Sequence, residues 1–426
     1  MTEKEIQWYK LDNAGKLFPS IATLRCTTVF RVSATLNDLV DPELLQLALN
    51  HLAPWLPYYQ VNLKRGFFWY YLEKVNKLPQ IEKESNYPCI YISFQKKGYF
   101  PFRILYFGKR ISLEIAHFLT DGTGAIVFLK SLLVEYFILK GIEFDLPEEL
   151  LHPDQKIQYD EYEDSFKKYY IETDNKIPQL KPAMHFPFPL TERGKYHIVT
   201  GIMPVSKVLE RAKKHNVTLT VFFLSLYIEA ILDFIIQTPS YIRSNLIKPV
   251  TINVPINLRS IFPSKTMRNF FLSITPSINP DIYNPGFDKI LESISYQMKE
   301  GIKKENLAPF IARNVKSETS IFIRLLPLLL KDTIMPFIYL AFGEYLYTSS
   351  ISNIGKISMP EQLENLIERF EFYPSPSRGN KIKTTIVSFK DKLYFTFGKL
   401  TRETIIEKLF FRKIIKSGIP VKIETN

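Results

Sequence analysis

The chain has 426 residues, of which 46% are hydrophobic and 23% are charged, and its formal net charge is +12 at pH 7. This composition excludes a disordered or fibrous protein, and the length allows two to three domains or one large two-lobed unit. Cys26 and Cys89 lack metal-type spacing, and residues 1–5 lack the apolar core of a signal peptide. We therefore expect a cytoplasmic protein with reduced thiols.

The first elements of the chain follow simple patterns. Alternating apolar residues predict a strand over residues 24–33, and Asp41 followed by Pro42 predicts the start of a helix. Residues 66–73 have aromatic side chains at both odd and even positions, which favours a strand that is covered on both faces.

The central motif follows a predicted hairpin that turns at residues 108–109. Its second arm runs into His117, and four residues later Asp121 and Gly122 begin a mostly apolar helix that we expect to end near Gly141. In the alternation of the strand, His117 falls on the same face as the apolar residues. Burial on that face disfavours the charged imidazolium. A neutral imidazole of this kind is suited to act as a general base on a hydroxyl or an amine.

Asp121 has two roles open to it from these residues alone. It could orient the His117 ring as the third member of a relay, or it could pair with an arginine and fix the loop. Gly122 and Gly124 permit close backbone approach or a positive φ, so a substrate could pass over the turn. The sequence lacks a Gly-x-Ser-x-Gly elbow, a His-Glu-x-x-His or Cys-x-x-Cys cluster and a Walker loop, which disfavours covalent hydrolases, metal enzymes and the usual nucleotide folds.

An acidic, proline-containing segment at residues 143–193 joins two halves of similar size. Eleven acidic residues and three lysines give residues 143–175 a charge of −8, so the other residues carry +20. That basic body could attract phosphate groups, or it could be a lysine-rich solvated surface. We predict an N-terminal lobe at 1–175, with 143–193 as its acidic crossover or linker, and a C-terminal lobe at 194–426.

The second half repeats the alternation of strands and helices. Predicted strands lie at 196–203, 249–255, 348–355, 384–389, 393–397 and 420–423, and predicted helices at 205–215, 218–236, 287–304, 321–342 and 401–416. The apolar stretches 125–139 and 321–342 contain charged residues, and the second also contains prolines, so we expect no transmembrane span.

The spacing His117-x-x-x-Asp121-Gly122 resembles the motif of the acyl-CoA-dependent acyltransferase superfamily, which includes chloramphenicol acetyltransferase and the condensation domains of peptide synthetases. Further stretches resemble its bacterial alcohol acetyltransferase-like branch over nearly the whole chain, namely residues 11–19, 66–71, 254–259, 262–270 and 352–355. The resemblance implies an α/β (α+β) fold of two chloramphenicol-acetyltransferase-like lobes, with mixed sheets and flanking helices around a central channel.

The resemblance also implies roles for single residues. His117 would be the catalytic base midway along the channel, and Asp121 would be structural beside Gly122 and would pair with Arg259. The further polar residues expected to line the channel or bind the substrate are Asn257, Asn269, Ser352 and Asn353, the last three also as oxyanion donors. Ala116 stands where condensation domains carry a first His, and the Asp-Phe-Gly-Trp-Gly motif of the plant enzymes is absent. Both departures argue against peptide synthesis on carrier proteins and against plant-type specificity.

The implied reaction moves an acetyl or other short or medium acyl group from a CoA thioester to a small alcohol or amine. Acyl-CoA would be the co-substrate, with an acyl carrier protein as the other donor and no metal, and the protein would be a monomer. One alternative is a non-catalytic, condensation-like protein that holds a carrier protein or a lipid-like ligand. A weaker alternative is nucleic-acid binding through the basic body, which no recognised motif accompanies.

Overall fold

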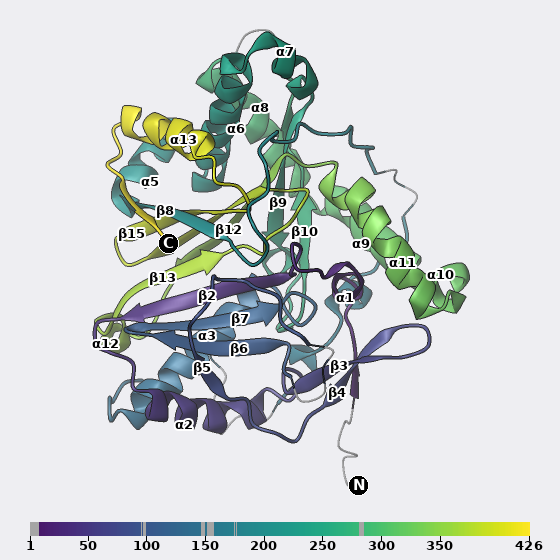
Figure 1. Cartoon of the computed structure of the whole chain (residues 1–426), viewed down its shortest axis with the longest axis vertical. Coiled ribbons are helices and arrows are strands. Elements are labelled where there is room, and N and C mark those ends of the chain that lie inside the picture. The colour runs from purple at the N-terminus through teal and green to yellow at the C-terminus, as the bar shows by residue number, and fades with distance from the viewer. Residues whose placement is uncertain are drawn as a thin grey trace.

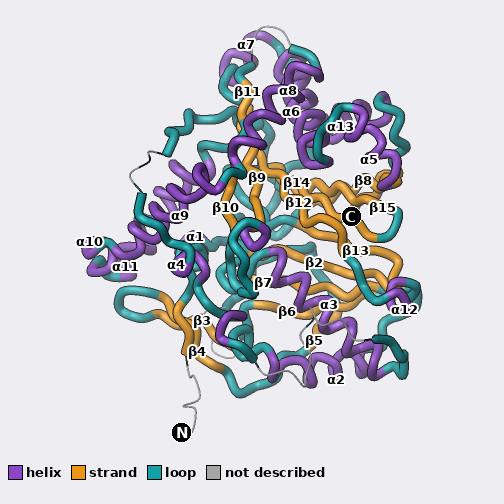
Figure 2. Tube along the Cα trace, turned by 180° about the vertical axis from the view of Figure 1, so that it is seen from behind, coloured by secondary structure: helices purple, strands orange, loops and turns teal. Residues whose placement is uncertain are grey.

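The computed structural model describes residues 8–94, 96, 99–145, 150, 157–173, 175, 177–280 and 285–426. Within these residues, two mixed β-sheets carry helices and form two lobes, which Figure 1 shows one above the other and Figure 2 shows from behind. The predicted α/β class is therefore confirmed.

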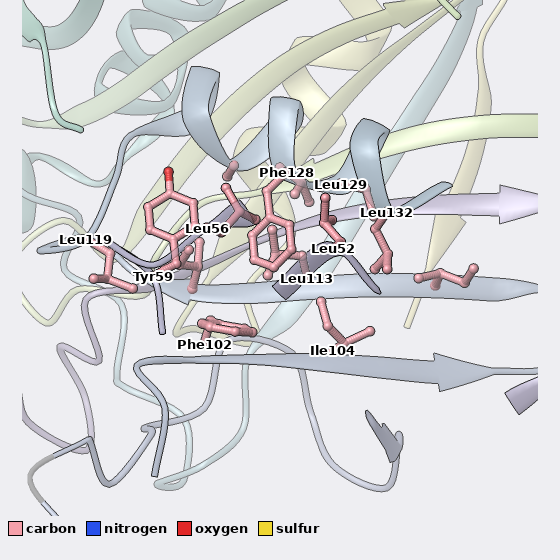
Figure 3. Packing of buried hydrophobic residues seen from close by; sticks show 14 of the residues in the cluster. Leu52, Leu56, Tyr59, Phe102, Ile104, Leu113, Leu119, Phe128, Leu129 and Leu132 are labelled. Atoms are coloured by element: carbon pink, nitrogen blue, oxygen red, sulfur yellow. The ribbon is translucent and has the colours of Figure 1, made fainter. Parts of the chain in front are cut away.

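The N-terminal lobe is built on a five-stranded sheet among the described residues. Its spatial order is β13 (Ile367–Tyr373), β2 (Val29–Leu36), β7 (Arg110–Ala116), β6 (Phe102–Phe107) and β5 (Ile81–Lys83). Its two long helices are α2 (Pro42–Leu52) and α3 (Gly122–Leu139). In Figure 3, Phe128, Leu129 and Leu132 of α3 point toward Leu113 of β7 and Ile104 of β6, and all five are buried. This apolar contact fixes α3 against the sheet and so places the start of the helix.

Local signals in this lobe produced both correct and wrong predictions. The hairpin of β6 and β7 is confirmed, and so is the start of α2, where the Asp41 side chain accepts hydrogen bonds from the backbone N–H groups of Glu43 and Leu44. The strand predicted over 24–33 begins only at Val29, because Thr28 has a φ of 54° and interrupts the extended backbone.

A smaller sheet beside this lobe has the order β1 (Trp8–Lys10), β4 (Tyr70–Lys74) and β3 (Val61–Arg65). The predicted strand over residues 66–73 is confirmed only from Tyr70 onward, and its first half is wrong. Residues 66–69 form the tip of the β3–β4 hairpin, where the Phe67 side chain is 73% exposed. The hairpin extends away from the lobe in Figure 1, and its tip meets the start of α11 (Leu328–Tyr339), where the N–H of Leu328 donates to the carbonyl of Phe67 at 2.8 Å and leaves the Phe67 ring exposed.

The C-terminal lobe is built on a larger sheet among the described residues. Its order is β10 (Phe271–Ile274), β9 (Val250–Asn257), β12 (Ser349–Ile357), β14 (Ile382–Phe389), β15 (Lys392–Lys399), β8 (His197–Pro204) and β16 (Lys422–Thr425), with β11 (Ser277–Ile278) paired to β9. The helices of its core are α5 (Val205–Lys214), α6 (Leu219–Gln237), α8 (Phe287–Gly301) and α13 (Ile405–Lys416).

By length and composition alone, α3 and α6 could each cross a membrane. However, 61% of the apolar window in α3 and 72% of that in α6 are buried inside the protein. The core helices of soluble proteins meet the same criterion, so these two helices are weak indicators of a membrane span.

The two halves of the chain are interlocked in space. Strand β13 comes from the second half but pairs antiparallel with β2, and its Phe370 and Phe372 belong to the core of the N-terminal lobe. The division of the chain into 1–175 and 194–426 stays a prediction. The remaining helices are α1 (Phe18–Ile21), α4 (Ser165–Lys168), α7 (Ser240–Arg243), α9 (Lys304–Thr319), α10 (Ile321–Leu325), α11 (Leu328–Tyr339) and α12 (Glu361–Glu364). Both β13 and α9 were missed in the sequence.

Candidate active site

His117 lies one residue beyond the end of β7. Its backbone N–H donates to the carbonyl of Thr28 at 2.8 Å, so the pairing of β7 with β2 continues into the motif. The imidazole stacks on the ring of Phe18, with 4.6 Å between centroids, and Phe30 and Phe271 lie 5.1 and 5.4 Å from it. Burial in this aromatic setting lowers the pKa of His117, so the ring is neutral at pH 7.

Asn269 determines which ring nitrogen of His117 carries the proton. Its Nδ2 group donates to the carboxylate of Asp12 at 3.0 Å and to the backbone carbonyl of His117 at 2.9 Å. Because both amide protons are used in this way, Oδ1 must face the ring, and it lies 3.0 Å from Nδ1 of His117. The neutral ring therefore has its proton on Nδ1, and the lone pair is on Nε2, which meets no hydrogen-bond partner among the described residues.

Asp12 holds Asn269 in turn. It accepts hydrogen bonds from the backbone N–H of Asn269 at 3.3 Å and from that of Gly15 at 2.5 Å. Burial, with the nearby carboxylate of Asp164, raises the pKa of Asp12 to about 7. Asp12 could not be predicted as a supporting residue, since it lies 257 positions from Asn269 and no local pattern connects the two.

The side chain of Asp121 has all its contacts away from the His117 ring. Its Oδ1 caps α3 by accepting from the N–H groups of Thr123 and Gly124, at 3.1 and 3.2 Å. Its Oδ2 accepts from the N–H of Phe270 at 2.9 Å and from Nη1 of Arg259 at 2.8 Å. Of the two roles left open by the sequence, this geometry matches pairing with an arginine to fix the loop, and it does not match orientation of the His117 ring.

Arg259 connects Asp121 to the loop at residues 263–270. Its guanidinium donates to the carbonyl of Thr266 at 3.0 and 2.9 Å and to that of Arg268 at 2.5 Å. The contact that the resemblance implied between Asp121 and Arg259 is thus present. The loop in turn carries Asn269, so the ion pair positions the residue that orients His117.

Gly124 is needed for close packing, since a Cβ atom there would lie 2.2 Å from Oγ1 of Thr120 and 2.4 Å from the carbonyl of Met267. A Cβ atom on Gly122 would be too close only to the terminal methyl of Ile354, at 2.8 Å, which can move, and would lie in ordinary contact with the Phe372 ring at 3.6 Å. Neither glycine has a positive φ. Close approach, one of the two properties expected of this pair, is therefore required at Gly124.

A cavity of about 480 Å³ lies between the lobes in front of His117. Its walls come from β9, β12 and β14 on one side and from α11 and the following π-helical turn (Leu340–Glu344) on another, with Phe18, Phe30 and Phe271 around the base. Asn257, Ser352 and Asn353 line this cavity as expected, and so do Asp121 and Gly122. Asn269 does not line it and instead supports His117 from behind.

The three predicted polar lining residues differ in their hydrogen bonds. Asn353 donates to Oγ1 of Thr220 at 2.9 Å and accepts from the N–H of Gly355 at 2.9 Å. Asn257 accepts from the N–H and Nη1 of Arg259. The Ser352 hydroxyl has no hydrogen-bond partner within the described ranges, so it is the freest donor of the set.

The described part of the chain contains no group of three or more His, Cys, Asp or Glu side chains able to hold a metal ion. The prediction of a metal-free reaction stays a prediction.

Comparisons with known proteins place the fold. No family model matches the chain, and no curated protein matches it. The structure of TRI101 from F. sporotrichioides, complexed with coenzyme A and T-2, has a TM-score of 0.61 at 10% identity and covers 98% of this chain and 99% of its own. The trichothecene 15-O-acetyltransferase TRI3 from Fusarium sporotrichioides has a TM-score of 0.59 at 8% identity, with 98% of both chains covered.

Condensation domains share the same architecture. The condensation domain of the Monacolin K polyketide synthase MokA has a TM-score of 0.56 at 11% identity and covers 97% of this chain and 96% of its own. In the larger nonribosomal peptide synthetase FmoA3, this chain spans 42% of the matched structure. The chain thus has the fold common to these acetyltransferases and condensation domains, as its resemblance to the acyltransferase superfamily implied.

Proposed function

We propose that the protein is an acyltransferase that moves an acetyl or other short or medium acyl group from a CoA thioester to an alcohol or an amine. The observation that carries this proposal is the His117 ring, which has its proton on the nitrogen that faces Asn269 and its lone pair on Nε2 beside the cavity. A neutral, oriented imidazole in an apolar setting is the arrangement that a general base needs.

In the proposed reaction, Nε2 of His117 takes the proton of the acceptor hydroxyl or amine while its oxygen or nitrogen attacks the thioester carbonyl. The carbonyl oxygen becomes an oxyanion, to which we assign the free Ser352 hydroxyl as a donor, with the second amide proton of Asn353. The carbon–sulfur bond then breaks, and the sulfur takes the proton back from His117. The products are the ester or amide and free thiol, and His117 returns to its neutral form.

The fold alone supports two donors, since TRI101 was complexed with coenzyme A and FmoA3 is a peptide synthetase. We propose CoA, because Ala116 replaces the first histidine of the condensation motif. The alternative is a condensation-like donor on an acyl carrier protein.

The test is a thiol-release screen of acyl-CoAs of increasing length against alcohols and amines, with the full chain. We expect acceptor-dependent release of CoA and an acylated product in the mass spectrum. The same screen with acyl carrier protein as donor separates the two donor classes. Absence of acceptor-dependent release from every donor would instead favour a non-catalytic binding protein.

A further inference from the structure

The cavity contains a second group of polar residues, away from the His117 motif. Asn253 of β9 pairs with Ser350 of β12, and Ile351 of β12 pairs with Thr384 of β14, so Ser350 lies beside Lys383. Both strand pairs are parallel, and all three side chains line the cavity. Neighbouring strands lie about 4.8 Å apart, so the row Asn253–Ser350–Lys383 extends about 10 Å across the sheet.

None of these three side chains has a hydrogen-bond partner among the described residues. Oδ1 of Asn253 is buried and unpartnered. The Ser350 hydroxyl and the Lys383 ammonium group border the cavity, and neither makes a hydrogen bond with any residue in the described ranges. Such groups are normally satisfied when they leave water, because an unpartnered buried group loses its hydration without replacement. The row therefore offers a ligand in the cavity two free donors, the hydroxyl of Ser350 and the ammonium group of Lys383, beside the amide of Asn253.

Lys383 gives this row its charge. No carboxylate in the described part of the chain lies within ion-pair distance of it. The carboxylate of Glu344 accepts hydrogen bonds from the hydroxyl of Ser377 and from the N–H of Gly379 instead. Burial lowers the pKa of Lys383, and a bound anion would act in the opposite direction.

We propose that the ammonium group of Lys383 and the hydroxyl of Ser350, with the Nδ2 group of Asn253 as a third donor, form a subsite that binds a carboxylate of the acceptor substrate. One cation beside two neutral groups matches a single negative charge better than the several phosphate charges of CoA. The acceptor would then be a hydroxy acid or an amino acid, with its carboxylate on the row and its hydroxyl or amine at His117. This inference rests on the proposed function and names the class of acceptor.

The first experiment measures equilibrium binding to the full chain and requires no turnover. Octanoate and octanol are matched probes that differ in charge, and Lys383→Met removes the cation while keeping most of the side-chain length. Lys392→Met is the matched control, because Lys392 is exposed on β15 and the substitution removes the same charge from the protein.

We expect Lys383→Met to weaken octanoate binding by about tenfold to a hundredfold, the range for a hydrogen bond to a charged group. Binding of octanol and of CoA should stay unchanged, and Lys392→Met should behave as the parent protein. Unchanged octanoate binding in Lys383→Met, or a loss of CoA binding in its place, would overturn the proposal.

The melting temperature provides an independent readout. Replacing an unpaired, partly desolvated cation with an apolar side chain should leave the melting temperature equal to that of the parent protein or raise it. A clear decrease would mean that Lys383 has a structural partner, and the proposed subsite would then be wrong.

Turnover distinguishes this inference from the proposed function. With an active enzyme, ω-hydroxyoctanoate should have a lower KM than octanol, and the difference should disappear in Lys383→Met. Carboxylate binding that depends on Lys383 without any acyl transfer would refute the acyltransferase and keep the subsite. Acyl transfer without preference for the hydroxy acid would refute the subsite and keep the acyltransferase.

Discussion

Two regions beside one cavity differ in how their polar groups are used. Around the motif, Asp121 accepts from four donors, and Asn269 uses both amide protons and its oxygen. Across the sheet, Oδ1 of Asn253 is buried without a partner, and the side chains of Ser350 and Lys383 line the cavity without a hydrogen bond to the described residues. The difference indicates that the first region holds the geometry of the site and the second is left for a ligand.

The largest expected loss of stability in the first region comes from removal of its Asp121–Arg259 ion pair. Asp121→Asn keeps the cap on α3 but leaves Arg259 without its carboxylate, and breaking a buried pair in this way costs about 3–5 kcal/mol. We expect a large decrease in the melting temperature, with activity falling only as the loop at 263–270 loses its position. Arg259→Gln should have a similar effect, and the double variant should lose less than the sum of the two.

A contrasting result would restore the relay role of Asp121. That result is a loss of activity in Asp121→Asn as severe as removal of the His117 imidazole, with the melting temperature unchanged. Scanning fluorimetry and thiol release on the same preparation distinguish these outcomes.

The next effect concerns the turn at Gly122 and Gly124 in the first region. Gly124→Ala would place a methyl group against Thr120 and the carbonyl of Met267, and overpacking of this kind costs about 1–3 kcal/mol. Gly122→Ala displaces only the end of Ile354 and should cost less than about 1 kcal/mol. Melting temperatures of the two variants check this order, and an equal loss in both would contradict the packing argument.

The smallest effect is on the pH dependence of activity. Burial lowers the pKa of His117, so the unprotonated base persists below pH 6.5, the ordinary midpoint, and activity should fall only at lower pH. The hydrogen bond from His117 to Asn269 partly opposes that shift, so Asn269→Leu should move the acid limb of kcat/KM to still lower pH. A variant with an unmoved limb would mean that Asn269 does not act on the ring.

Asp12 requires a separate control in that profile, because its pKa is raised to about 7 and it contacts Asn269. Asp12→Asn removes this titration. Any inflection near pH 7 that disappears in Asp12→Asn belongs to Asp12, and the limb that remains below pH 6.5 belongs to His117.

The sequence predicted local features better than long-range ones. The hairpin, the cap of α2 and the start of α3 depend on residues close in the chain, and each is present in the structure. The Arg259 contact was implied by the resemblance and not by spacing. The support of His117 by Asn269 and Asp12 could not be predicted, because tertiary packing alone brings these residues together.

Strand β13 illustrates the same limit on the scale of the fold. Phe372 pairs with Val32 from the other end of the chain, so no pattern near residue 372 reveals that the strand completes the N-terminal sheet. The unsatisfied row was missed for the same reason, since its members come from three separate strands.

The most direct test of the central claim is to compare His117→Ala with the parent protein in acceptor-dependent CoA release and in equilibrium binding of acyl-CoA. General-base catalysis contributes about a hundredfold to ten-thousandfold, so the rate should fall by that amount while acyl-CoA binding and the melting temperature change little. Retention of most of the CoA release by His117→Ala would contradict the assignment of His117 as the base.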